Sequence, residues 1–116
     1  MLGQESNIGA HVEYDSRWVR SALIQSDFLA SGRSIDADMR SVMAFAIRWA
    51  PFGGASPGDL LVAFGVDRRR FLQLLEEALG IRRSDSSEQR WIKRRLSDAL
   101  SSAWQVEGSF PTAAAR

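Results

Sequence analysis

Three consecutive arginines at positions 68–70 and a glutamine at position 73 carry side chains that can read the edges of DNA bases. An arginine binds the O6 and N7 atoms of guanine together, and a glutamine binds N6 and N7 of adenine, because their planar groups match these atom pairs. Such contacts are made near the N-terminus of a helix that enters the major groove. The sequence therefore predicts base contacts by Arg68, Arg69 and Gln73.

The other basic side chains of this half of the chain suit the DNA backbone, whose phosphates bind arginine and lysine without regard to sequence. The expected phosphate contacts are Arg70, Arg82, Arg83, Arg90, Lys93, Arg94 and Arg95. A run of arginines is more often simply a solvated helix face. However, arginines at the start of a helix oppose its dipole, and such a local conflict is typical of a binding site.

Two short helices joined by a glycine turn must position these side chains. Ser56 as N-cap and Pro57 as first helical residue predict a helix start, Gly65 predicts its end, and Asp67 is a second N-cap. This order is the sequence form of a helix-turn-helix, which we predict over residues 56–79.

The apolar residues of this segment follow the spacing of that motif. Counted from Pro57, six positions that are usually apolar or glycine agree: Leu60, Phe64, Gly65, Val66, Phe71 and Leu74. The fifth position is usually small because the two helices approach closely there, and Leu61 departs from this pattern.

A longer stretch, residues 43–79, resembles a known family. The matching residues are Phe45-Ala46-Ile47-Arg48-Trp49, then Phe64-Gly65-Val66-Asp67-Arg68-Arg69-Arg70-Phe71-Leu72-Gln73-Leu74-Leu75, and Leu79. They are similar to a family of small, uncharacterised actinobacterial helix-turn-helix proteins. The resemblance implies an all-α fold and a helix-turn-helix class but no particular target. Asp67, Leu72 and Glu76 depart from the family pattern, and Glu76 places an acid on the presumed DNA face.

The rest of the chain predicts further amphipathic helices. Apolar residues recur at helical spacing in residues 14–29, 36–50 and 87–104, with Asp15 or Ser16 capping the first of these helices and Asp85 or Ser87 the last. We therefore expect an all-α bundle of about four helices.

The domain boundaries follow from where this periodicity stops. We expect residues 13–107 to form one helical domain, with residues 1–12 and 108–116 as flexible ends. The last helix carries an apolar stripe of Ile92, Leu96 and Leu100, which must be buried either in the core or at the seam of a homodimer.

Composition excludes several classes of function. The chain has 116 residues, no cysteine and one histidine, so neither a disulfide framework nor a zinc site with cysteine ligands is possible. No acid–base pair has a matching partner, and no apolar run approaches the ~20 residues of a membrane helix. We expect a cytoplasmic, non-catalytic protein without metal or cofactor, such as a small transcriptional regulator or phage-type accessory factor that binds double-stranded DNA.

A second hypothesis is a protein-interaction module without direct DNA binding. Aromatic side chains lie on the predicted helices at 14–29 and 87–104, and large aromatics often anchor interfaces. The candidate interface residues are Trp18, Trp91 and Trp104, and the partner would be another protein or a second copy of the chain.

Overall fold

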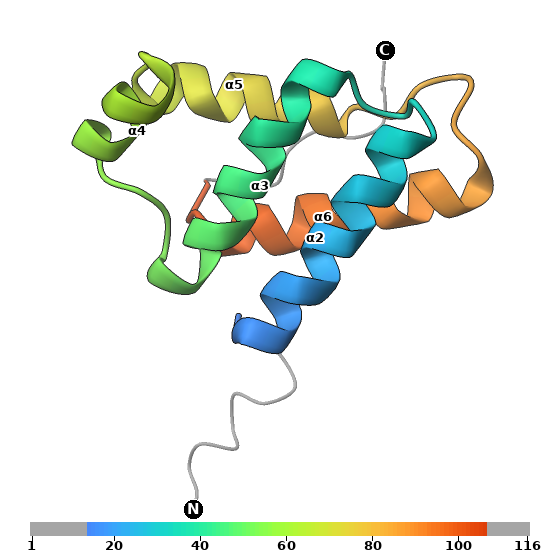
Figure 1. Cartoon of the computed structure of the whole chain (residues 1–116), viewed down its shortest axis with the longest axis horizontal. Helices are drawn as coiled ribbons and strands as arrows, with labels where there is room; N and C mark the ends of the chain where they lie inside the picture. The colour runs from blue at the N-terminus through green and yellow to red at the C-terminus, as the bar shows by residue number, and fades with distance from the viewer. Residues whose placement is uncertain (1–13, 107–116) are drawn as a thin grey trace, which may run out of the picture.

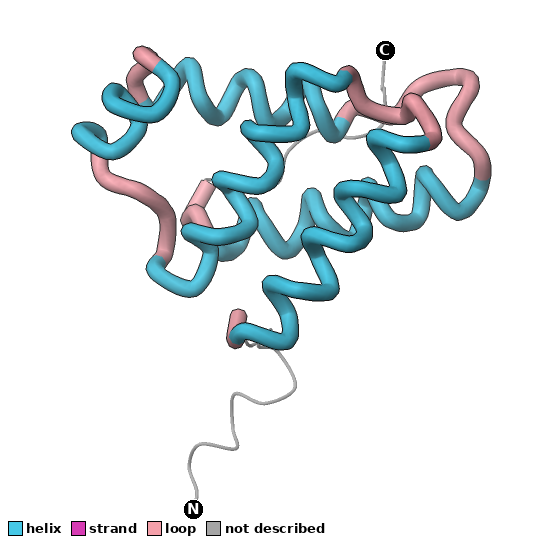
Figure 2. Tube along the Cα trace, viewed as in Figure 1, coloured by secondary structure: helices cyan, strands magenta, loops and turns pink. Residues whose placement is uncertain are grey.

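A computed structural model describes residues 14–106, so the predicted flexible ends at 1–12 and 108–116 lie outside the described residues. The α-helices are α2 (Ser16–Ser31), α3 (Arg40–Trp49), α4 (Pro57–Phe64), α5 (Arg68–Leu79) and α6 (Ser87–Ala103). Short 3₁₀ turns, η1 (Ala37–Met39) and η2 (Ala50–Phe52), precede and follow α3. Figure 2 shows helices joined by loops, without a strand among the described residues, which confirms the all-α prediction.

Four of the helices pack in a closed circuit around the core. Helix α2 packs on α3, α3 on α5, α5 on α6, and α6 on α2. In Figure 1, α2 and α3 lie in front of α5 and α6, while α4 lies at one end of the molecule and packs on α5. The α2 helix buries Ala22 and Leu29 in the core, so this segment is a core helix.

Local capping explains most of the helix starts. The Asp15 carboxylate accepts a hydrogen bond from the Trp18 N–H at 2.9 Å, and the Asp67 carboxylate accepts one from the Arg70 N–H at 2.8 Å. Ser56 and Asp59 form a reciprocal capping box at the start of α4. Gly65 ends α4 with a φ of 69°, the left-handed conformation that favours glycine. These four signals lie where the sequence predicts them.

The start of the last helix differs from the prediction. Ser86, and neither Asp85 nor Ser87, is the N-cap of α6, because its hydroxyl accepts a hydrogen bond from the Gln89 N–H at 3.1 Å. Asp85 instead points into the protein and is buried.

Trp104 closes the centre of the core. Its side chain is fully buried, its indole Nε1 donates to the Ala46 carbonyl oxygen at 3.0 Å, and its ring stacks on Phe71 at 5.0 Å. Gly54 has a φ of 110°, and a Cβ added there would approach Trp104 Cε3 to 3.0 Å, so both the backbone conformation and the close indole favour glycine at this position. The prediction that Trp104 is an interface residue is therefore wrong.

The apolar stripe of α6 is also buried within the monomer. Ile92, Leu96 and Leu100 are all buried in the core formed with the other helices. Of the two alternatives for this stripe, burial in the core is therefore the one that the structure shows, and no apolar surface of the stripe is left for the seam of a dimer.

Candidate nucleic-acid interface

The outward side of α5 presents the predicted base-reading residues. Arg69 and Gln73 are exposed and lie four residues apart, which places them on one side of the helix. Phe71 and Leu75 are fully buried and hold the opposite side against the core. The position and orientation of these two polar side chains are thus fixed by a rigid element.

The neighbouring arginines differ in how much of their side chain is available. The guanidinium of Arg68 donates to the Trp104 carbonyl oxygen at 2.7 Å, so this half-buried side chain is tied to the core. Arg70 Nη1 lies 3.3 Å from Gln73 Oε1 and 3.9 Å from Glu77 Oε2. Arg70 is exposed, and its contacts place it beside Gln73 on the surface of α5.

A second group of arginines lies beyond the other end of α5. Arg82 donates to the Arg33 carbonyl oxygen at 3.1 Å and to Asp36 Oδ1 at 3.0 Å, and Arg90 donates to the Arg83 carbonyl oxygen at 3.4 Å. A helix of 12 residues is about 18 Å long, so this group is well separated from the arginines at the start of α5.

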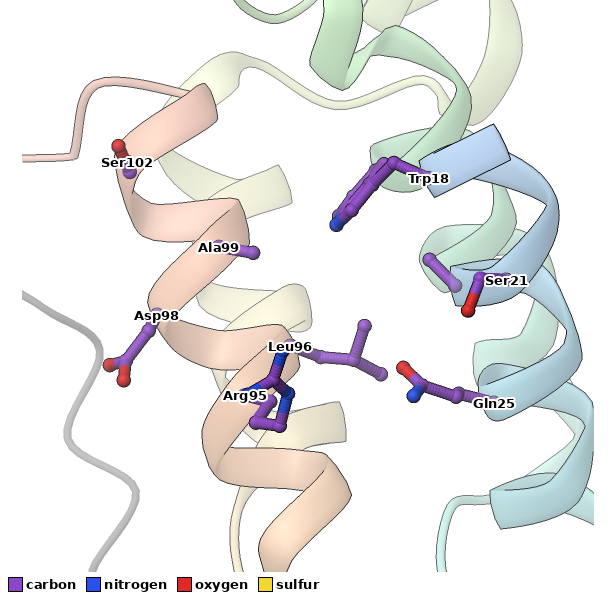
Figure 3. A pocket seen from close by; sticks show the side chains of 9 residues that line it. Trp18, Ser21, Gln25, Arg95, Leu96, Asp98, Ala99 and Ser102 are labelled. Atoms are coloured by element: carbon purple, nitrogen blue, oxygen red, sulfur yellow. The ribbon is translucent and has the colours of Figure 1, made fainter. Parts of the chain in front are cut away.

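The arginines of α6 divide between two sides of that helix. Arg95 lies over the ring of Trp91 at 4.9 Å and lines a groove of about 360 Å³ between α2 and α6, together with Trp18 (Figure 3). Arg94 is exposed but does not line this groove, since it lies about 100° further round the helix. The predicted phosphate contacts therefore do not form one continuous surface.

Lys93 is not a surface residue, and its predicted contact with phosphate is wrong. Its side chain has no exposed area, and its Nζ donates to Asp85 Oδ2 at 2.9 Å, to the Ser34 carbonyl oxygen at 2.8 Å and to the Gly80 carbonyl oxygen at 2.8 Å. These contacts use all three donors of the ammonium group. Lys93 therefore binds together the loop after α2, the end of α5 and the loop before α6.

Sequence reasoning missed Asp85 as the partner of this lysine. Removal of the carboxylate from water by burial favours the neutral acid, but hydrogen bonds from the Arg82 N–H, Lys93 and the Ser34 hydroxyl outweigh it and lower the pKa of Asp85. Burial also lowers the pKa of Lys93, an effect that the contact with Asp85 opposes. The pair is therefore a structural clamp, fully hydrogen-bonded at neutral pH.

The lowered pKa of Asp85 predicts a loss of stability in acid. Because its pKa is lower in the folded protein than in the unfolded chain, its stabilising contribution is complete above about pH 4 and is lost as the pH falls through the folded-state pKa. Urea unfolding at a series of acidic pH values measures this loss. An NMR titration in which the Asp85 carboxyl group has an ordinary or raised pKa would contradict the prediction.

Some classes of site are absent from the part of the chain that the structure describes. Residues 14–106 contain no group of three or more histidine, cysteine or acidic side chains placed to hold a metal ion. Within the same residues, no helix has the length and apolar character needed to cross a bilayer.

Comparisons with known proteins identify no relative of this chain. No protein-family model, curated protein or solved structure matches the chain.

Proposed function

We propose that this protein binds double-stranded DNA without catalysis, through the outward side of α5, in the manner of a small regulatory protein. The observation that carries the proposal is the exposure of Arg69 and Gln73 on a helix whose other side is fixed by Phe71 and Leu75. Arg69 and Gln73 would contact base edges, and Arg70 would hold a neighbouring phosphate. Arg68 would act mainly by fixing the start of α5 against Trp104.

The charges of this region favour DNA over an uncharged ligand, but they also limit the affinity. The N-terminus of α5 carries the positive end of the helix dipole, and Arg69 and Arg70 add two full charges beside it. Glu77, at 3.9 Å from Arg70, offsets part of this charge. We therefore expect binding to random duplex DNA to be weak at physiological salt and to strengthen log-linearly as the salt concentration falls.

One binding assay separates the base reader from the phosphate contacts. We expect Arg69→Ala to cost about 1–3 kcal/mol on the preferred sequence and to remove preference at one base pair, because its bidentate contact to guanine exists for that sequence only. Arg70→Ala is expected to weaken binding about equally on every duplex and to reduce the salt slope by about one unit. Fluorescence anisotropy over a salt series measures both effects.

Arg95 provides the matched control for that assay. It is also an exposed arginine, but it belongs to α6 and lies in the groove with α2, which no residue of α5 lines. Arg95→Ala should leave DNA binding unchanged. Unaltered binding after both Arg69→Ala and Arg70→Ala, or no binding of the wild-type protein at low salt, would contradict the DNA proposal.

The groove between α2 and α6 supports a second candidate, a protein-interaction module. Trp18 at one end of this groove is half-buried and packs edge-on against Tyr14 at 4.9 Å, and the opposite wall offers Leu96 and Ala99 (Figure 3). A groove that combines such apolar side chains with polar ones such as Gln25, Arg95 and Asp98 can accommodate a partner helix or extended peptide. A protein complex abolished by Trp18→Ala, in a protein without affinity for DNA, would favour this candidate.

A further inference from the structure

A polar groove between α2 and α3 contains side chains that the DNA proposal does not use. Its polar lining consists of Ser26 and Asp27 from α2 and of Arg40, Ser41 and Arg48 from α3. The two helices lie in front of α5 in Figure 1, and no residue of α5 lines the groove. Its volume of about 390 Å³ lies within the range of about 300–1,000 Å³ that is typical of small-molecule sites. The groove is therefore a candidate for a ligand other than DNA.

The hydroxyl of Ser26 is a polar group without a partner in a nearly buried residue. Only 3% of Ser26 is exposed and the residue lines the groove, so its small exposed part faces the groove. Its hydroxyl makes no hydrogen bond to any residue within 14–106. A hydroxyl that is removed from bulk water and left unpaired costs free energy, unless a molecule in the groove supplies the missing hydrogen bond. Ser26 therefore points to a ligand that accepts a hydrogen bond.

Two arginines of α3 determine the charge of that ligand. Arg40 and Arg48 lie on one side of the helix, about 12 Å apart along its axis, and the small side chain of Ala44 between them leaves the intervening space open. Arg40 Nη2 donates to Asp27 Oδ1 at 2.8 Å, which leaves other N–H groups of this guanidinium available. Arg48 is exposed and has no ion-pair partner in the part of the chain that the structure describes. With two arginines against one aspartate, the lining has a net positive charge and favours an anion.

We propose that this groove binds the phosphate group of a small phosphate monoester. The three terminal oxygens of such a phosphate accept hydrogen bonds from several directions, which suits donors that come from both helices. Arg48 binds the phosphate through its free guanidinium, while Arg40 and Ser26 donate from the other parts of the groove. A carboxylate has only two oxygens and a single charge, so it would leave more of these donors unused. The apolar side chains of Leu23 and Ala44, which also line the groove, contact the organic part of the ligand.

An NMR titration with phenyl phosphate, at constant ionic strength in chloride, tests the proposal. We expect backbone amide shifts that are concentrated in residues 23–27 and 40–48 and that saturate with a dissociation constant of about 0.1–10 mM. Inorganic phosphate should bind at the same residues but more weakly, because it lacks the organic part, and phenol should not bind there. Shifts that do not saturate up to about 20 mM phenyl phosphate, or phenol binding as tight as that of phenyl phosphate, would overturn the proposal.

Two variants and a matched control connect this binding to named side chains. Ser26→Ala should weaken phenyl phosphate binding about five- to tenfold without lowering the urea midpoint, because the hydroxyl that it removes has no partner within residues 14–106. Arg48→Gln should weaken binding by at least about tenfold. The control is Arg17→Gln, an exposed arginine that lies half a turn from Ser26 around α2 and outside the groove, and it should bind like the wild type. A Ser26→Ala variant that is destabilised but binds normally would overturn the proposal.

DNA binding by the same variants separates this proposal from that for α5, and neither depends on the other. Arg48→Gln should bind duplex DNA like the wild type, because the groove is formed by α2 and α3 alone. A loss of DNA binding as large as that of Arg70→Ala would show that the groove holds a phosphate of the duplex, and it would overturn the small-molecule site. A protein that binds phenyl phosphate but no DNA would support the groove proposal and contradict only the α5 proposal.

Discussion

Replacing Phe71 by alanine is expected to lower the free energy of unfolding by about 3–5 kcal/mol. The ring has no exposed area and lies 5.6 Å from Phe45, 5.5 Å from Phe64 and 5.0 Å from Trp104, measured between ring centroids. Removing it leaves a cavity among three rigid aromatic rings, which relax poorly into the space. Because Phe71 also fixes α5, the orientation of Arg69 depends on it.

Urea unfolding followed by circular dichroism measures this loss. The matched control is Phe52→Ala, the same substitution at a ring that is 73% exposed, where we expect a change of less than about 1 kcal/mol. Similar losses for the two variants would show that Phe71 does not occupy the core position described, and the orientation of α5 would then be wrong as well.

Lys93→Met is expected to be about as damaging, with a loss of about 3–5 kcal/mol. Methionine fills much of the space of the lysine stem, so the expected loss comes from electrostatics. The Asp85 carboxylate would remain buried without its cation, and the carbonyl oxygens of Ser34 and Gly80 would lose the donor that they share. The loss should be visible as a lower urea midpoint at neutral pH.

A double variant distinguishes this electrostatic cause from simple packing. Adding Asp85→Asn to Lys93→Met removes the unpaired charge, and we expect the double variant to be more stable than Lys93→Met alone. Arg94→Met, at the exposed neighbouring position, should change stability by no more than about 0.5 kcal/mol. A double variant less stable than Lys93→Met would contradict the clamp.

The sequence predicts the helices well because their ends depend on neighbouring residues. Three helices are capped by the residue that immediately precedes them, namely Asp15, Ser56 and Asp67. Helix α4 ends at Gly65 because this residue adopts the left-handed backbone conformation. Such signals act over three or four residues. Periodicity and caps therefore suffice for them.

The clamp and the buried indole depend on segments that are distant in the sequence. Lys93 contacts Ser34, 59 positions away, and Trp104 contacts Ala46, 58 positions away. The burial of Lys93 could nevertheless have been predicted from one feature of the sequence. Lys93 precedes Leu96 by three residues and Leu100 by seven, so helical spacing places it on the apolar side of α6.

The candidate interface was predicted only in part for the same reason. The sequence places Arg69 and Gln73 on one side of a helix, which needs only the helical repeat. It cannot show that the arginines at 82–83 lie beyond the far end of α5, or that Arg95 faces α2, because these facts depend on how whole helices cross. Leu61, the residue that departs from the motif spacing, is mostly exposed and so does not fill the angle between α4 and α5.

The position of Trp104 in the sequence has a consequence for the order of folding. During synthesis, α2, α3, α4 and α5 leave the ribosome before this residue does, yet the indole stacks on Phe71 and covers Gly54. The emerging chain therefore carries the local capping signals of these helices but lacks the ring on which they pack, and its apolar surface stays open to chaperones. The packed core can form only after α6 has emerged, so its completion is a late step in the biogenesis of the protein.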